Sequence, residues 1–226
     1  MTEMSTSNKG LFISFEGIDG CGKSTQVQLL MDKLEKEGVD SMLVREPGGS
    51  TISEEIRNIL LKTRSETMSA RAEALLMTAS RAQLTKDTIL PALERGTCVI
   101  ADRYQDSTLA YQGGGRGLDV DYLIQLNTFA TYALDPDLTF YIDISSEEGL
   151  KRSGTLNPDR IESAGLKFQE KVREQYLKLV HRYPNRFIII DGTGSIEGIH
   201  GTIWEKTINC LNIFYFQRLF KLSVAA

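Results

Sequence analysis

The sequence predicts an α/β fold built on a parallel β-sheet. Five short apolar runs recur along the chain, and longer segments with helical apolar spacing lie between them. Most of the short runs are apolar at nearly every position, which is typical of strands covered by helices on both faces. Strands that alternate with helices in this way favour parallel pairing, because the helix carries the chain back to the start of the next strand.

We expect the five strands at residues 11–16, 41–45, 98–102, 138–144 and 186–190. No linker rich in glycine, proline or serine divides the chain. We therefore expect one domain over residues 1–226, with a polar and flexible stretch at residues 1–9.

The helices are expected at residues 23–38, 53–62, 69–96, 119–133, 166–183 and 195–211. Gly38 fits the position after a helix, where glycine is common, and Ser53 fits a helix N-cap. Pro91 predicts a bend or break in the third helix. Residues 213–226 are apolar at helical spacing, and they are expected to pack either on the core or on a second subunit.

Composition excludes several classes of protein. The 226 residues carry 26 basic and 30 acidic side chains, and this net charge of −4 argues against a general nucleic-acid binder. Three cysteines without a C-x-x-C pair are typical of reduced thiols, so we expect a cytoplasmic protein. No apolar run approaches the roughly 20 residues that a membrane-spanning helix needs, and we expect no membrane association.

The stretch EGIDGCGKST, residues 16–25, matches the pattern G-x-x-x-x-G-K-[ST] of a phosphate-binding P-loop. Its glycines let backbone N–H groups surround an anion, and the following helix contributes its positive end. Lys23 supplies a charge for the β- and γ-phosphates, and the Ser24 hydroxyl can ligate Mg²⁺. We expect ATP with Mg²⁺ to contact Gly17, Ile18, Asp19, Gly20, Cys21, Gly22, Lys23, Ser24 and Thr25.

A kinase also needs a second anion site for the group that receives the phosphate. Residues 45–51 follow the second strand and contain a Pro-Gly-Gly turn, with Arg57 in the helix that follows. Residues 102–117 follow the third strand, where Asp102 can hold Mg²⁺ or its waters and Arg103 can clamp a phosphate. Arg81, in the middle of a helical segment, is a third candidate. Each candidate has an alternative interpretation: residues 45–51 are a plain connection, residues 102–117 are a polar surface loop, and Arg81 is a solvated helical arginine.

Four segments, FEGIDGCGKST, REPGG, SRAQL and DRYQDSTLAYQG, occur in this order and together resemble the bacterial thymidylate kinases. The resemblance covers roughly residues 10–210. It implies a three-layer P-loop kinase fold with a five-stranded parallel sheet, and a homodimer. It also implies the reaction of ATP with dTMP to give ADP and dTDP.

The resemblance assigns roles residue by residue. Arg81 is expected to bond the thymine O4, Thr108 and Gln112 to lie near the rest of the base edge, and Tyr111 to crowd the sugar C2′. Asp19 is expected near the acceptor sugar and the metal, and Met77 stands where many relatives stack a phenylalanine on thymine. The full set expected around the acceptor, including the arginines near its phosphate, is Arg45, Glu46, Pro47, Arg57, Met77, Arg81, Arg103, Ser107, Thr108, Tyr111 and Gln112.

Some members of the family carry an arginine inside the P-loop, whereas this chain has Gly20 there. It therefore resembles the class that keeps its catalytic arginines in a mobile lid, here residues 150–165. Lys151, Arg152 and Arg160 are the cations of that segment, and the sequence leaves open which of the two arginines reaches the phosphoryl group. The expected catalytic residues are Lys23, Asp19, Arg103, Arg152 and Arg160, with Ser24 and Asp102 at the metal.

Two other functions compete with this interpretation. One is a kinase of the same fold that acts on another deoxynucleotide or on a deoxynucleoside. The other is a nucleotide-dependent switch, although the N-K-x-D motif of GTPases does not occur in the sequence.

Overall fold

The structure is a computed structural model that describes residues 9–63, 66–154 and 160–224. One sheet contains five parallel strands in the order β2-β3-β1-β4-β5. The strands are β1 (Phe12–Glu16), β2 (Ser41–Arg45), β3 (Cys98–Asp102), β4 (Leu138–Asp143) and β5 (Phe187–Asp191). The predicted five-stranded parallel sheet is thereby confirmed, with every strand within about a residue of its expected bounds.

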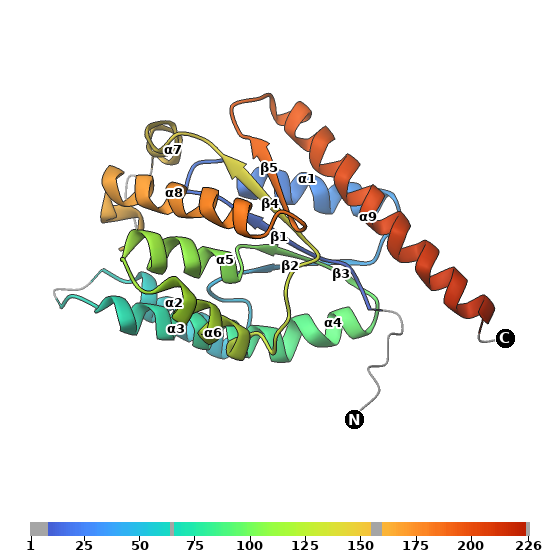
Figure 1. Ribbon diagram of the computed structural model, residues 1–226, viewed down its shortest axis with the longest axis horizontal. Coiled ribbons are helices and arrows are strands. Elements are labelled where there is room, and N and C mark those ends of the chain that lie inside the picture. The colour runs from blue at the N-terminus through green and yellow to red at the C-terminus, as the bar shows by residue number, and fades with distance from the viewer. Residues whose placement is uncertain (1–8, 64–65, 155–159, 225–226) are drawn as a thin grey trace.

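Helices cover both faces of the sheet (Figure 1). They are α1 (Lys23–Lys36), α2 (Thr51–Leu61), α3 (Ala70–Leu84), α4 (Leu90–Glu94), α5 (Gln105–Thr108), α6 (Val120–Ala130), α7 (Ser146–Ser153), α8 (Leu166–Arg182) and α9 (Ile196–Val224). Two π-helical segments, η1 (Thr85–Ile89) and η2 (Leu109–Gly115), and one 3₁₀ turn, η3 (Glu162–Ala164), complete the assignment.

The core consists of two apolar clusters, one on each face of the sheet. Neighbouring residues of β1 point to opposite faces, so that Phe12 joins the cluster with α4 while Ile13 joins the cluster with α1, α8 and α9. Both side chains are fully buried. This two-sided burial explains why the strand sequences are apolar at successive positions rather than at alternate ones.

Two helix boundaries differ from the sequence-based expectation. Ser53 is not the N-cap of α2: Ser50 is, and its side chain accepts a bond from the Ser53 backbone N–H. The hydroxyl of Ser53 is buried and donates to the Ser80 carbonyl instead. The irregularity expected near Pro91 occurs just before it, where the helix changes to the wider π-helical segment η1. Pro91 has no backbone N–H to donate to the preceding turn.

The segment after β3, the expected lid and the C-terminal tail are each partly helical. Residues 105–115, which follow β3, form α5 and η2 rather than an open loop. The expected lid at residues 150–165 begins inside α7, and its residues 155–159 lie outside the described part. Most of the expected C-terminal tail continues α9, which extends past the body of the molecule in Figure 1. The stretch expected to be flexible, residues 1–9, lies outside the described residues except for Lys9.

Over the described residues, no helix combines the length and the apolar character needed to cross a bilayer.

Candidate active site

The strand register brings three predicted segments together at the carboxyl edge of the sheet. Asp102, at the end of β3, is in register with Phe15 of β1 and with Arg45 of β2. The P-loop, the turn after β2 and the segment after β3 therefore begin side by side, although they are far apart in sequence. Two cavities of about 370 and 210 Å³ lie there.

The larger cavity is formed by the P-loop. Gly17, Gly20 and Gly22 all have positive φ, at 145°, 77° and 94°, which turns the chain around the cavity at low cost only for glycine. The Lys23 side chain is buried, and its Nζ donates to the carbonyls of Gly17 at 3.0 Å and Ile18 at 2.9 Å. The residues that line this cavity are Asp19, Gly20, Gly22, Lys23, Ser24, Thr25, Asp102, Arg103 and Ser153.

Ser24 and Asp102 provide oxygen ligands at the edge of this cavity. The Ser24 hydroxyl donates to Oδ2 of Asp102 at 3.2 Å. Such a pair fits Mg²⁺, which prefers hard oxygens and usually keeps several waters and substrate phosphates rather than a cage of protein ligands. The described residues contain no cluster of three or more histidine, cysteine and acidic side chains that could hold a metal ion.

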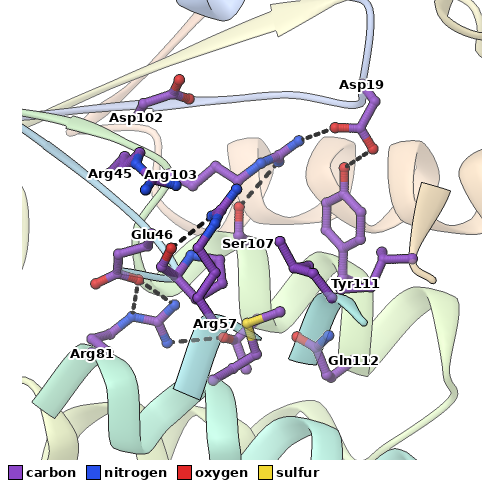
Figure 2. Close-up of a pocket in the computed structure, with 15 residues that line it drawn as sticks. Asp19, Arg45, Glu46, Arg57, Arg81, Asp102, Arg103, Ser107, Tyr111 and Gln112 are labelled. Atoms are coloured by element: carbon purple, nitrogen blue, oxygen red, sulfur yellow. Dashed lines mark hydrogen bonds and ion pairs between the residues drawn. The ribbon is translucent and has the colours of Figure 1, made fainter. Parts of the chain in front are cut away.

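The smaller cavity is lined by every residue that the sequence predicted for the acceptor site. Its lining consists of Asp19, Arg45, Glu46, Pro47, Arg57, Leu61, Met77, Arg81, Asp102, Arg103, Ser107, Thr108, Tyr111, Gln112 and Ile161. Figure 2 shows these side chains converging from α3, from the turn after β2 and from the helical segment after β3. Leu61 and Ile161 were not predicted, and they add apolar surface on one side.

Asp19, Asp102 and Arg103 line both cavities. Arg103 has a φ of 72°, which is unusual for a residue other than glycine, and its Nη2 lies 2.6 Å from Oδ1 of Asp19. Its Nη1 donates to the Gly17 carbonyl at 2.9 Å, and the guanidinium lies over the Tyr111 ring. Burial opposes the ionisation of Asp19, but Arg103 and Lys23 outweigh it, so that the pKa of this carboxyl is lowered. The wall between the cavities therefore carries a fixed ion pair.

Arg81 and Glu46 form a buried ion pair at the base of the smaller cavity, with Arg81 Nη2 2.6 Å from Glu46 Oε2. Arg81 also donates from Nε to Glu46, from Nη1 to Thr108 and Asn127, and from Nη2 to the Tyr104 carbonyl. Burial raises the pKa of Glu46 to about 7, although the charge of Arg81 opposes the rise.

The two other arginines of the smaller cavity lie nearer its mouth. Arg45 donates to both oxygens of Glu54, at 3.0 and 3.1 Å, and about half of its side chain is exposed. Arg57 donates to the Pro47 carbonyl at 2.7 Å. Together with Arg103 they place three guanidinium groups around one end of the cavity (Figure 2), an arrangement that suits a dianionic phosphate.

Residues on the opposite side of the cavity have the chemistry to contact a base and a sugar. Thr108 accepts from Arg81, and the Gln112 amide nitrogen donates to Glu73 at 2.8 Å. The Tyr111 hydroxyl donates to Oδ2 of Asp19 at 3.2 Å. Met77 contributes a flexible thioether surface that can pack against a ring.

Neither lid arginine lines either cavity. Arg152 pairs with Glu148 at 2.7 Å and donates to the Gly192 carbonyl, whereas Arg160 pairs with Glu73 at 2.6 Å and donates to the Leu60 carbonyl. Their neighbours do reach the site, since Ser153 lines the larger cavity and Ile161 the smaller one. The two lid arginines therefore point away from both cavities toward other partners, and Lys151 is exposed on α7.

Sequence reasoning missed two buried glutamates that support the site. Glu16 accepts from the Tyr104 N–H, from Ser107 and from Tyr176, and thereby holds the turn that carries Arg103. Glu73 accepts from Gln112, Arg116 and Arg160. Glu16 adjoins the P-loop, which was a usable signal. Glu73 lies in a helix whose apolar spacing does not reveal that an acid faces inward.

Comparison with known proteins gives consistent results. A family model described as "Thymidylate kinase" matches residues 15–203. A thymidylate kinase of Caldanaerobacter subterraneus subsp. tengcongensis is 50% identical over 192 residues, covering 85% of this chain and 92% of that one. One from Fervidobacterium nodosum is 49% identical over 193 residues, covering 85% and 96%. The crystal structure of thymidylate kinase from Ehrlichia chaffeensis superposes with a TM-score of 0.73 at 32% identity, covering 88% of this chain and 98% of that one.

Proposed function

This chain belongs to the thymidylate kinase family, and we propose that it transfers the γ-phosphoryl group of ATP to dTMP, producing ADP and dTDP. The observation that carries the proposal is the pair of cavities that share Asp19, Asp102 and Arg103. The larger cavity is lined by the P-loop. The smaller cavity combines three guanidinium groups with a surface suited to a nucleoside. Donor and acceptor bound there would meet at the shared wall.

In the proposed reaction, an oxygen of the dTMP phosphate attacks the γ-phosphorus while the bond to the β–γ bridging oxygen breaks. The nucleophile is already anionic, so that catalysis consists mainly of positioning and of stabilising the charge on the transferring group. Lys23 holds the donor phosphates, and Arg45, Arg57 and Arg103 hold the acceptor phosphate. The lid arginines Arg152 and Arg160 stabilise the charge on the transferring group.

Ser24 and Asp102 would hold Mg²⁺ in this scheme, supported by their hydrogen-bonded oxygens at the edge of the P-loop cavity. A bound magnesium ion would neutralise charge on the β- and γ-phosphates. Asp19 remains ionised beside Arg103, and their ion pair holds the Arg103 guanidinium in place between the two cavities.

The acceptor roles proposed for the other residues follow their positions in the smaller cavity. Arg81, Thr108 and Gln112 face the base, Met77 packs on it, and Tyr111 lies beside the sugar. Glu46, Pro47 and Ser107 complete the lining.

We also propose a homodimer in the cytoplasm. The dimer is supported by exposed apolar side chains on adjacent helices of one face, namely Leu75 of α3 and Tyr122 and Phe129 of α6, of which Phe129 is 84% exposed. The location is supported by three free cysteines, Cys21, Cys98 and Cys210.

The test of the reaction is ADP release from ATP with a panel of nucleoside monophosphates and deoxynucleosides. We expect dTMP to be the best acceptor by kcat/KM. A better turnover of another deoxynucleotide or a deoxynucleoside would support the alternative kinase. ATP or GTP hydrolysis that no acceptor accelerates would support a nucleotide switch and contradict the proposal.

A further inference from the structure

Glu73 is a buried acid just outside the acceptor cavity. It lies on α3 with its side chain 1% exposed, although a carboxylate is costly to remove from water unless donors replace its hydration. Two segments supply those donors. Gln112 lies in η2 and Arg116 directly follows it, whereas Arg160 belongs to the segment after α7. A charge this well satisfied next to a binding site is a candidate for positioning the residues that contact it.

The donors saturate the carboxylate. Oε1 accepts from Gln112 Nε2 at 2.8 Å and from Arg116 Nε at 3.1 Å. Oε2 accepts from Arg116 Nη2 at 3.1 Å and from Arg160 Nη1 at 2.6 Å. A carboxylate has about four lone-pair sites on its two oxygens, and these four bonds use them.

This arrangement dictates which end of the Gln112 amide faces inward. Burial opposes the ionisation of Glu73, but the hydrogen bonds from Arg116 and Gln112 outweigh it and lower the pKa of the carboxyl. An ionised carboxylate can only accept hydrogen bonds, so that Gln112 must turn its NH₂ group toward Glu73. Its carbonyl oxygen then lies at the other end, and Figure 2 shows that oxygen on the side of the remaining lining residues.

We propose that Glu73 is a positioning residue that presents the Gln112 carbonyl oxygen to the acceptor base and thereby selects bases that carry an imide N–H. This inference rests on the proposed function, because it assumes that a nucleotide base occupies the smaller cavity. Thymine and uracil carry a hydrogen at N3 that can donate to this oxygen. Cytosine has an acceptor at N3, so that two acceptors would face each other.

The experiment measures kcat/KM for dTMP and for dCMP in the wild type and in Glu73→Gln. The substituted amide can accept or donate, so that Gln112 is free to turn over. We expect the dTMP:dCMP ratio to fall at least tenfold. Arg81 also distinguishes the two bases, but it is present in both proteins, and its effect cancels when the two ratios are compared.

Gln112→Leu and the double variant complete a cycle. If Glu73 acts through Gln112, the single variants lower the ratio by similar factors and the double variant lowers it no further. Losses that multiply in the double variant would show that Glu73 acts by another route, and they would overturn the inference.

Arg160→Ala is the matched control, because it removes another partner of Glu73 but leaves the bond to Gln112 in place. We expect it to change turnover of dTMP and dCMP by the same factor. A fall in the ratio equal to that of Glu73→Gln would overturn the inference. If Glu73→Gln does not fold, Glu73→Asp, whose shorter side chain withdraws the carboxylate from Gln112, provides the same comparison.

Failure of this inference and failure of the proposed function give different results. If the wild type phosphorylates dTMP and the ratio is unchanged in Glu73→Gln, the inference is wrong and the function stands. If the wild type phosphorylates neither nucleotide, the proposed function itself is wrong.

Discussion

Lys23 shows how a single side chain acquires a fixed position in the P-loop. Its ammonium is held by the Gly17 and Ile18 carbonyls, which belong to the loop that surrounds the cavity. In the proposed donor site this charge would already be in place before a phosphate binds, and little rearrangement would be needed.

We expect Lys23→Ala to lower kcat by well over tenfold while the protein remains folded, as measured by steady-state kinetics and circular dichroism. A tenfold loss corresponds to about 1.4 kcal/mol of transition-state stabilisation. Lys36→Ala removes the same charge from the exposed end of α1 and should leave kcat unchanged. Retention of more than a tenth of the wild-type kcat in Lys23→Ala would contradict the assigned role.

Glu46 predicts a specific dependence of stability on pH. Its pKa rises from an ordinary value of 4.5 to about 7 on folding, mainly because the carboxyl is buried. Below pH 4.5 both states are protonated. As the pH rises from 4.5 to 7, the unfolded chain releases the proton while the folded chain retains it. The ionisation of Glu46 therefore lowers the free energy of unfolding of the protein as the pH rises.

Glu46→Gln cannot titrate and should lack this component. We expect the unfolding free energy of the wild type to fall by about 3 kcal/mol relative to Glu46→Gln between pH 4.5 and 7. Urea denaturation at several pH values measures the difference. A difference that stays constant, or that grows with pH in favour of the wild type, would contradict the raised pKa.

At the scale of elements, the P-loop and α7 meet through two glycines. A Cβ on Gly20 would lie 2.2 Å from the Gly149 carbonyl oxygen, and a Cβ on Gly149 would lie 2.8 Å from the Asp19 carbonyl oxygen. In the sequence, Gly20 stands where some relatives have an arginine. The structure adds a steric reason for glycine at this position, because a side chain there would collide with α7. The close approach sets the distance between the donor site and the start of the expected lid.

Gly20→Ala should therefore destabilise the protein by about 1–3 kcal/mol through overpacking, with added strain at positive φ, and should lower activity. Thermal unfolding and turnover measure the two effects. Gly201→Ala is the comparison, because a Cβ there meets open space inside α9, and it should be neutral or stabilising by about 0.5–1 kcal/mol. Equal stability of the two variants would show that the loop and α7 are not tightly packed.

At the scale of the whole molecule, Figure 1 shows α2, α3 and α6 grouped on one side of the sheet. The exposed aromatic and aliphatic side chains of α3 and α6 form a face suited to a second copy of the chain. Because the proposed active site lies beside α3, such pairing would also brace the helix that carries Arg81 and Glu73.

Phe129→Glu is expected to convert a dimeric wild type to a monomer in sedimentation velocity, without loss of folding, because the side chain is 84% exposed within one chain. Ile196→Glu introduces the same charge at an exposed position of α9, away from this face, and should remain dimeric. A monomeric wild type, or dimerisation unaffected by Phe129→Glu, would contradict the proposed interface.

The individual side chains expected around the acceptor came from a family resemblance, whereas sequence patterns alone determined the parallel sheet, the P-loop and the polar segments that follow β2 and β3. These features are encoded locally, by apolar runs at strand length, by glycine spacing, and by polar groups at the ends of strands that parallel pairing brings together. Only the tertiary structure decided which polar groups pair. It placed Arg160 against Glu73, paired Arg81 with Glu46 and Thr108, and buried Glu16 and Glu73 behind the site. Such pairings join residues from separate elements, and their geometry depends on how helices pack on the sheet, which apolar periodicity does not specify.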